Sequence, residues 1–134
     1  MVYLALIVGT IASAILGFVW YGPLFGKIWQ KHVGLPQEFF EEQKKKGSGR
    51  TIALNLLSQF ITACVTLTLL RMLGVTTVIG AWEILTLVWL GFSFPVELGN
   101  ILWTGKSGSL LYINTAYRLL SYLIMGISII LIAY

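Results

Sequence analysis

The chain has 134 residues, of which 57% are hydrophobic and only 10% are charged, with a net charge of +4 and a mean hydropathy of +0.87. A soluble domain carries roughly 25% charged residues to cover its surface, so this composition excludes an ordinary soluble globular protein. One cysteine and one histidine exclude an intramolecular disulfide and the usual metal-ligand clusters.

Four apolar segments, each close to the length of a bilayer span, cover most of the chain: residues 2–21, 52–73, 78–103 and 110–134. A helix needs ~20 apolar residues to cross the hydrocarbon core, where backbone groups have no water to bind. We therefore predict an all-α polytopic membrane protein, a single domain over residues 1–134 built as a four-helix transmembrane bundle. No basic residue precedes the first segment, so we expect it to be retained rather than cleaved as a signal peptide.

The first segment carries a regular stripe of small residues. They recur every four positions and comprise Ala5, Gly9, Ser13 and Gly17. Small side chains let helix backbones approach closely where lipid gives no hydrophobic drive for association. We predict a helix-packing stripe whose partner is another helix of this chain, which we favour, or a second copy.

The loop over residues 22–51 is the only long polar segment. Its first part, residues 24–33, has apolar side chains at helical spacing and is predicted to form a short interfacial helix. Pro36 suits the first turn of a second helix, which would end in a run of lysines before Gly47. Five residues are predicted to anchor this region at the membrane interface: Trp20, Tyr21, Phe25, Lys27 and Trp29.

The distribution of lysine and arginine predicts the orientation. Six of the nine basic residues lie in loop 22–51, Lys106 lies between the third and fourth segments, and the connection 74–78 has no charge. Basic loops stay in the cytoplasm, so loop 22–51 is predicted inside and both termini outside, in a cytoplasmic (inner) membrane. The basic residues are attributed to topology and anionic lipid, and no nucleic-acid partner is expected.

An internal repeat is one interpretation of the apolar pattern, and coincidence is the other. Residues 16–29 align with residues 90–103 without a gap, matching Leu-Gly-Phe at the start and tryptophan at the end. Two tandem helical hairpins in the same orientation would produce this pattern. The following segments then pair Asn55 with Asn114 and Gln59 with Arg118.

Polar residues inside the segments are the best candidates for function, because a charge within a membrane is costly and usually meets a partner or a cavity. Glu97 and Arg118 lie nine and twelve residues from Lys106, at similar depths, so an ion pair between them is expected. The rest of the predicted cluster comprises Asn100, Asn114, Asn55 and Gln59. One interpretation is a structural pair that fixes helix register, which we favour. The other is a transport site in which Glu97 accepts a proton or cation.

Pro95 is expected to kink the third span.

At Trp20-Tyr21-Gly22-Pro23-Leu24-Phe25-Gly26-Lys27 the chain resembles a prokaryotic four-span membrane family known only as a domain of unknown function. The similarity continues through residues 89–92, Pro95, Asn100, and residues 113–126. The resemblance implies four helices and a bacterial or archaeal cytoplasmic membrane, and it implies no activity. This chain departs from the family pattern at Glu97, a position that is often apolar.

We expect a non-enzymatic protein with no cofactor and no metal, because no nucleophile, metal cluster or nucleotide-binding motif is evident. The favoured hypothesis is a small membrane protein that associates with itself or serves as an accessory subunit of a membrane complex. Its expected partners are the lipid bilayer and either further copies or other membrane subunits. The alternative is a small homo-oligomeric transporter or channel for an ion or small solute.

Overall fold

The computed structural model describes residues 1–134 and contains only helices. Its elements in chain order are α1 (Val2–Val19), η1 (Trp20–Leu24), α2 (Gly26–His32), α3 (Gln37–Lys46), α4 (Gly49–Met72), α5 (Val78–Val88), η2 (Trp89–Ser93), α6 (Phe94–Thr104) and α7 (Gly108–Ala133), where η denotes a π-helical turn. Four continuous helices are long and apolar enough to cross a membrane: Val2–Leu24, Gly49–Met72, Val78–Thr104 and Gly108–Ala133. The predicted all-α fold with four such helices is confirmed.

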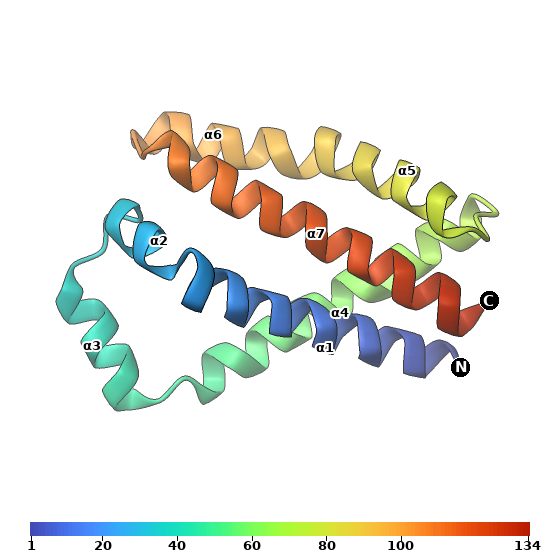
Figure 1. The fold of residues 1–134 in the computed structure, drawn as a ribbon, viewed down its shortest axis with the longest axis horizontal. Helices are drawn as coiled ribbons and strands as arrows, with labels where there is room; N and C mark the ends of the chain where they lie inside the picture. Colours follow the sequence, from blue (N-terminus) through green and yellow to red (C-terminus); the bar gives the residue numbers. More distant parts are fainter.

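The four long helices run along the longest axis of the molecule, and the two ends differ (Figure 1). Both termini and the α4–α5 turn lie at one end, called here the termini end. The helices α2 and α3 and the α6–α7 turn lie at the other, called the α3 end. Gly74 and Gly105 end α4 and α6 with positive φ angles of 68° and 66°, which glycine adopts without strain. Thr77 and Ser107 then cap α5 and α7 through their hydroxyls.

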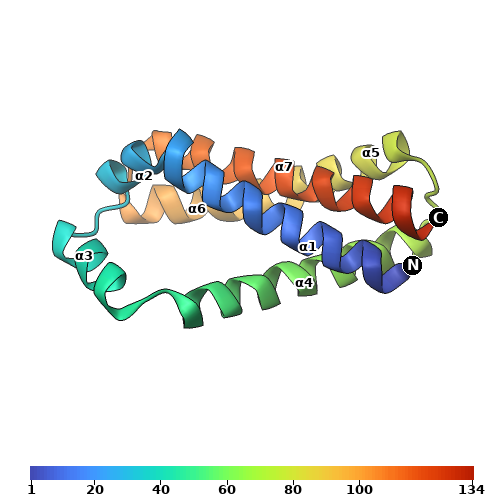
Figure 2. The same cartoon turned by 60° about the horizontal axis from the view of Figure 1, so that its bottom comes forward.

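Helix α7 is the centre of the bundle. It contacts α1, α4, α5 and α6, and also α2. The main apolar core lies toward the termini end, and its eight members are Leu6, Ala63, Leu67, Leu70, Ala81, Met125, Ile129 and Ile130. Toward the α3 end, α4 diverges from the other helices (Figure 2), and residues 49–55 are all exposed.

The small residues of α1 face α7. Ala5, Gly9 and Ser13 are buried. A Cβ on Gly9 would lie 3.6 Å from the Met125 Cα, and one on Gly17 would lie 3.0 Å from the Tyr117 hydroxyl. The partner of this stripe in the structure is therefore an internal helix.

One π-helical turn ends the first long helix and another lies within the third, and the two have matching sequences. Both have a Trp-x-Gly-x-x-Phe pattern, in which the Trp20 and Phe25 rings and the Trp89 and Phe94 rings pack in tilted pairs with centroids 4.6 and 5.6 Å apart. The Trp20 indole donates to the Ile113 carbonyl at 2.9 Å, and the Trp89 indole donates to the Thr115 carbonyl at 2.8 Å. If the sequence contains an internal repeat, the structure makes Trp20 correspond to Trp89. The sequence alignment of residues 16–29 with residues 90–103 instead places Trp20 opposite Phe94, five residues later.

Each turn also accommodates a proline. Pro23 lies inside η1, and Pro95 follows η2 in the first turn of α6. Proline removes a backbone donor and clashes with the carbonyl four residues earlier, and a widened turn relieves that clash. The first helix was expected to end near Tyr21. The helix instead continues to Leu24, because the π-helical turn η1 accommodates Pro23, and the chain turns at Phe25.

The segment after this turn folds back on the bundle. Helix α2 contacts α7, and α3 is joined to it through the Trp29 and Phe40 rings, whose centroids are 5.8 Å apart. Gly26 begins α2 so close to η1 that a Cβ there would lie 2.6 Å from the Tyr21 carbonyl oxygen. Glycine is therefore required at this bend.

Candidate functional site

A polar cavity of about 480 Å³ lies between α4, η2, α6 and α7. Its lining consists of Tyr21, Asn55, Gln59, Phe92, Ser93, Val96, Glu97, Asn114, Thr115, Tyr117 and Arg118. Toward the α3 end, the ribbon of α4 diverges from that of α6 (Figure 2), and side chains of both helices line the cavity. At the mouth, Phe92 and Val96 are 76% and 62% exposed, and Asn55 is also exposed. The cavity therefore opens sideways, between α4 and α6.

Two side-chain hydrogen bonds at the cavity wall connect η1 to α6 through α7. The Tyr21 hydroxyl donates to Asn114 Oδ1 at 2.7 Å, and Asn114 Nδ2 donates to Glu97 Oε1 at 2.8 Å. The Asn114 side chain thus accepts from the Tyr21 hydroxyl through its oxygen and donates to the Glu97 carboxylate through its nitrogen. This arrangement fixes the Glu97 side chain at the wall of the cavity.

A second network joins α4, α7 and α1 behind the cavity. Gln59 is 3% exposed, and its Nε2 donates to the Tyr117 hydroxyl at 3.0 Å. That hydroxyl donates to the Ser13 carbonyl at 3.2 Å. Ser121 donates weakly to Gln59 Oε1 at 3.5 Å, and Ser13 donates to the Ser121 carbonyl at 3.4 Å. Every buried side-chain polar atom in the structure has a partner.

The expected ion pair between Glu97 and Arg118 is not formed, although both residues line the same cavity. Glu97 binds the Asn114 amide instead. The Arg118 guanidinium has no hydrogen bond or ion pair and lies 5.8 Å from the centroid of the Tyr117 ring. Helix rise fixes how deep two residues lie and leaves open which way their side chains point, so similar depth did not bring these two charges into contact.

Arg118 lies deep in the bundle. It comes ten residues after Gly108, the start of α7, which corresponds to ~15 Å along the helix axis. Gln59 lies ten residues after Gly49, at a similar depth on α4. The cavity floor is therefore near the middle of the long helices rather than at their ends.

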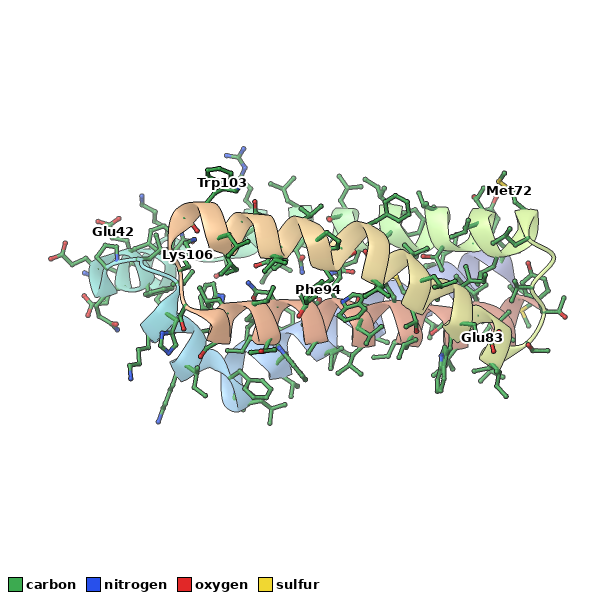
Figure 3. The ribbon with its side chains drawn as sticks, turned by 90° about the horizontal axis from the view of Figure 1, so that it is seen from above. Glu42, Met72, Glu83, Phe94, Trp103 and Lys106 are labelled. Atoms are coloured by element: carbon green, nitrogen blue, oxygen red, sulfur yellow. The ribbon has the colours of Figure 1, made fainter.

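A smaller cavity of about 250 Å³ adjoins the first one on the α3 side. Asn100, Thr104 and Lys106 contribute its polar lining, and it shares Glu97 and Asn114 with the larger cavity. Lys106 lies at the α6–α7 turn (Figure 3). The Glu97–Asn114 hydrogen bond therefore separates a space near the end of the bundle from the deeper cavity.

The structure thus brings five of the six predicted cluster residues to one cavity, and Asn100 to the adjoining one. The predicted interfacial anchors are divided. Trp20 and Tyr21 hydrogen-bond inward to α7, and Trp29 packs against Tyr21 with ring centroids 5.7 Å apart. Phe25 stacks on Trp20, while Lys27 is exposed.

Sequence reasoning missed several members of the site. Tyr117 and Ser121 join Gln59 in the inner network, and Ser93 and Thr115 line the cavity. Ser13 was predicted only as a packing residue, and its hydrogen bond to the Ser121 carbonyl was not. A tyrosine within an apolar span gives a detectable signal, because its hydroxyl needs a partner there. Serine and threonine give no such signal, because in many helices their hydroxyls donate to backbone carbonyls of the same helix.

The lining can bind a polar molecule through a guanidinium, a carboxylate and several amide and hydroxyl groups. The structure contains no group of three or more histidine, cysteine, aspartate or glutamate residues that could hold a metal ion. The side chains that line the cavity offer hydrogen bonds and charge pairing to such a molecule.

A family model described as a protein of unknown function (DUF1761) matches residues 4–130. The match covers nearly the whole chain, and the chain belongs to this family. No curated protein and no solved structure matches the chain.

Proposed function

We propose that this chain is a multi-pass membrane protein that binds a small polar solute in the cavity between α4, α6 and α7 and takes part in its passage across the membrane. The observation that carries the proposal is the lining: a carboxylate, an unpaired guanidinium and three amides surround about 480 Å³ at mid-depth in the long helices. Charged groups within a membrane are costly and are retained where they face a partner or a water-filled space.

The absence of an ion pair favours binding over a purely structural role. A register-fixing pair would bring Glu97 and Arg118 together, whereas here Glu97 is held by Asn114 and Arg118 faces the cavity. The volume of about 480 Å³ lies within the ≈ 300–1,000 Å³ range of small-molecule sites. Both charges remain available to a bound solute.

We further propose a prokaryotic cytoplasmic membrane with the α3 end in the cytoplasm. Seven of the nine basic residues support this orientation: six lie between residues 27 and 50, and Lys106 lies in the α6–α7 turn. The smaller cavity would then adjoin the cytoplasmic side and the termini would lie outside.

Osmotic swelling of liposomes tests this function. Purified protein is reconstituted, and swelling is followed by light scattering in glycine, glycerol and urea. At least one solute should enter faster than into protein-free liposomes, and Glu97→Gln or Arg118→Gln should abolish most of that difference. Glu83→Gln and Arg71→Gln are the controls, because they remove the same charges from exposed positions outside the cavity. Entry at the protein-free rate for every solute contradicts the proposal.

Self-association or an accessory role is a second candidate, favoured by the first part of α4. Residues 49–55 are helical yet exposed on all sides, as expected of a segment that another helix covers in an assembly. A second copy or a different subunit placed there would lie beside the mouth of the cavity. The mass of the complex after mild extraction from its source membrane distinguishes copies of this chain from foreign subunits, and a monomeric mass contradicts this second candidate.

A further inference from the structure

We infer that the ligand of the cavity is a zwitterion that carries a primary ammonium and an oxyanion: the ethanolamine phosphate head of a lipid, or a free solute with the same two groups. The inference rests on the proposed binding function and names its ligand class. It comes from two opposite charges that line one cavity without binding each other.

Arg118 supplies the site for the oxyanion. Its guanidinium has five N–H donors in a planar fork that matches carboxylate and phosphate oxygens. No acceptor binds it in the structure, where its neighbour is the Tyr117 ring at 5.8 Å. A cation at this depth is stabilised by an anionic partner, and the cavity gives such a partner access to it.

Glu97 supplies the site for the ammonium. Asn114 donates to Oε1 and leaves Oε2 free, and an ionised carboxylate accepts several hydrogen bonds at once. Asn114 also holds the carboxylate in place, because its oxygen is engaged by Tyr21. A primary ammonium can donate to Glu97, whereas a quaternary ammonium has no N–H to donate.

The sideways position of the cavity mouth makes a lipid a candidate ligand. It opens sideways between α4 and α6 and is flanked by the exposed apolar side chains of Phe92 and Val96. In a membrane this face meets lipid, so acyl chains could remain outside while a head group enters. A free solute would instead come through the smaller cavity near Lys106, past the Glu97–Asn114 hydrogen bond.

The test is native mass spectrometry of the intact protein in detergent with three short-chain probes: dioctanoyl phosphatidylethanolamine, phosphatidylcholine and phosphatidylglycerol. We expect the ethanolamine lipid to bind about tenfold or more tightly than either of the others. Arg118→Gln should weaken its binding by about 10- to 100-fold, the range for a lost hydrogen bond to a charged group. Glu97→Gln should remove the preference for ethanolamine and leave phosphatidylglycerol binding unchanged.

Arg71→Gln and Glu83→Gln are the matched controls and should bind as the wild type does; Glu83 lies near the opposite end of the bundle from Lys106 (Figure 3). Circular dichroism verifies that each variant is folded. Competition by phosphoethanolamine or glycine at concentrations similar to that of the lipid would identify a free solute as the source. Competition only at a large excess would identify the lipid, because its acyl chains add contacts that the free zwitterion lacks.

Equal binding of the three lipids by the wild type, with no competition by either free zwitterion, overturns the inference. Folded Arg118→Gln protein that binds as the wild type does also overturns it. Either result combined with solute entry into liposomes refutes the ligand class and leaves the proposed function standing. Selective binding without any solute entry refutes passage across the membrane and supports the ligand class.

Discussion

Asn114 donates its side-chain amide to the Glu97 carboxylate over 2.8 Å. The same amide accepts the Tyr21 hydroxyl at 2.7 Å, so one residue of α7 connects η1 to α6. This relationship fixes the acid of the cavity and takes the place of the ion pair expected from the sequence. It also forms the boundary between the larger and the smaller cavity.

Replacing Asn114 by alanine should destabilise the protein by about 1–2 kcal/mol, because two interhelical hydrogen bonds are lost and each contributes ~0.6 kcal/mol on average in a membrane protein. Unfolding by SDS in mixed micelles, followed by circular dichroism, measures the change. Asn100→Ala is the control, because Asn100 is exposed and should unfold as the wild type does. If the wild type, Asn114→Ala and Asn100→Ala proteins unfold at the same SDS fraction, the two Asn114 hydrogen bonds contribute nothing to stability.

Tyr117→Phe should also cost about 1–2 kcal/mol. The variant keeps the ring but loses the hydroxyl that accepts from Gln59 and donates to the Ser13 carbonyl, leaving the buried Gln59 amide without an acceptor. Tyr112→Phe is the matched control, since Tyr112 is 73% exposed. The same unfolding measurement applies, and a Tyr117→Phe protein as stable as the control would refute a stabilising role for this network.

Gly26→Ala should destabilise the bend between η1 and α2 by about 1–3 kcal/mol, the usual range for overpacking. The new Cβ would lie 2.6 Å from the Tyr21 carbonyl oxygen, which belongs to the backbone and has little room to move. Gly22→Ala, four residues earlier, meets nothing within 4 Å and serves as the control. A thermal melt in detergent compares the two, and equal melting temperatures would argue against the close approach at Gly26.

Composition and hydropathy were enough to predict the helices. The four segments expected at 2–21, 52–73, 78–103 and 110–134 agree closely with the observed ones, because helix length in a membrane is set by bilayer thickness. The polar residues of the spans also identified five of the eleven residues that line the cavity, since such residues are rare and costly in an apolar segment. These features depend on local sequence alone.

The features that were missed depend on how the helices pack. The sequence does not specify that α7 is central, because four apolar helices of similar length permit several arrangements. The π-helical turns were not foreseen either. Pro23 was expected to end the first helix, and the widened turn instead let it continue. The depths of Glu97 and Arg118 follow from their distances to the α6–α7 turn, but the sequence does not specify that Asn114, rather than Arg118, donates to the Glu97 carboxylate.

The most direct test of a water-filled binding cavity is the reaction of a cysteine at Ser93 with a membrane-impermeant cationic methanethiosulfonate reagent in liposomes, in a Cys64→Ser background. Ser93 lines the cavity, eleven residues before Thr104 and therefore ~16 Å along the axis. Leu120→Cys is the control at similar depth, twelve residues after Gly108 and outside the cavity lining. Only a thiol in contact with water ionises and reacts, so we predict at least about tenfold faster reaction for Ser93→Cys. If neither cysteine reacts until the protein is denatured, the cavity holds no accessible water, and the account of a binding site is contradicted.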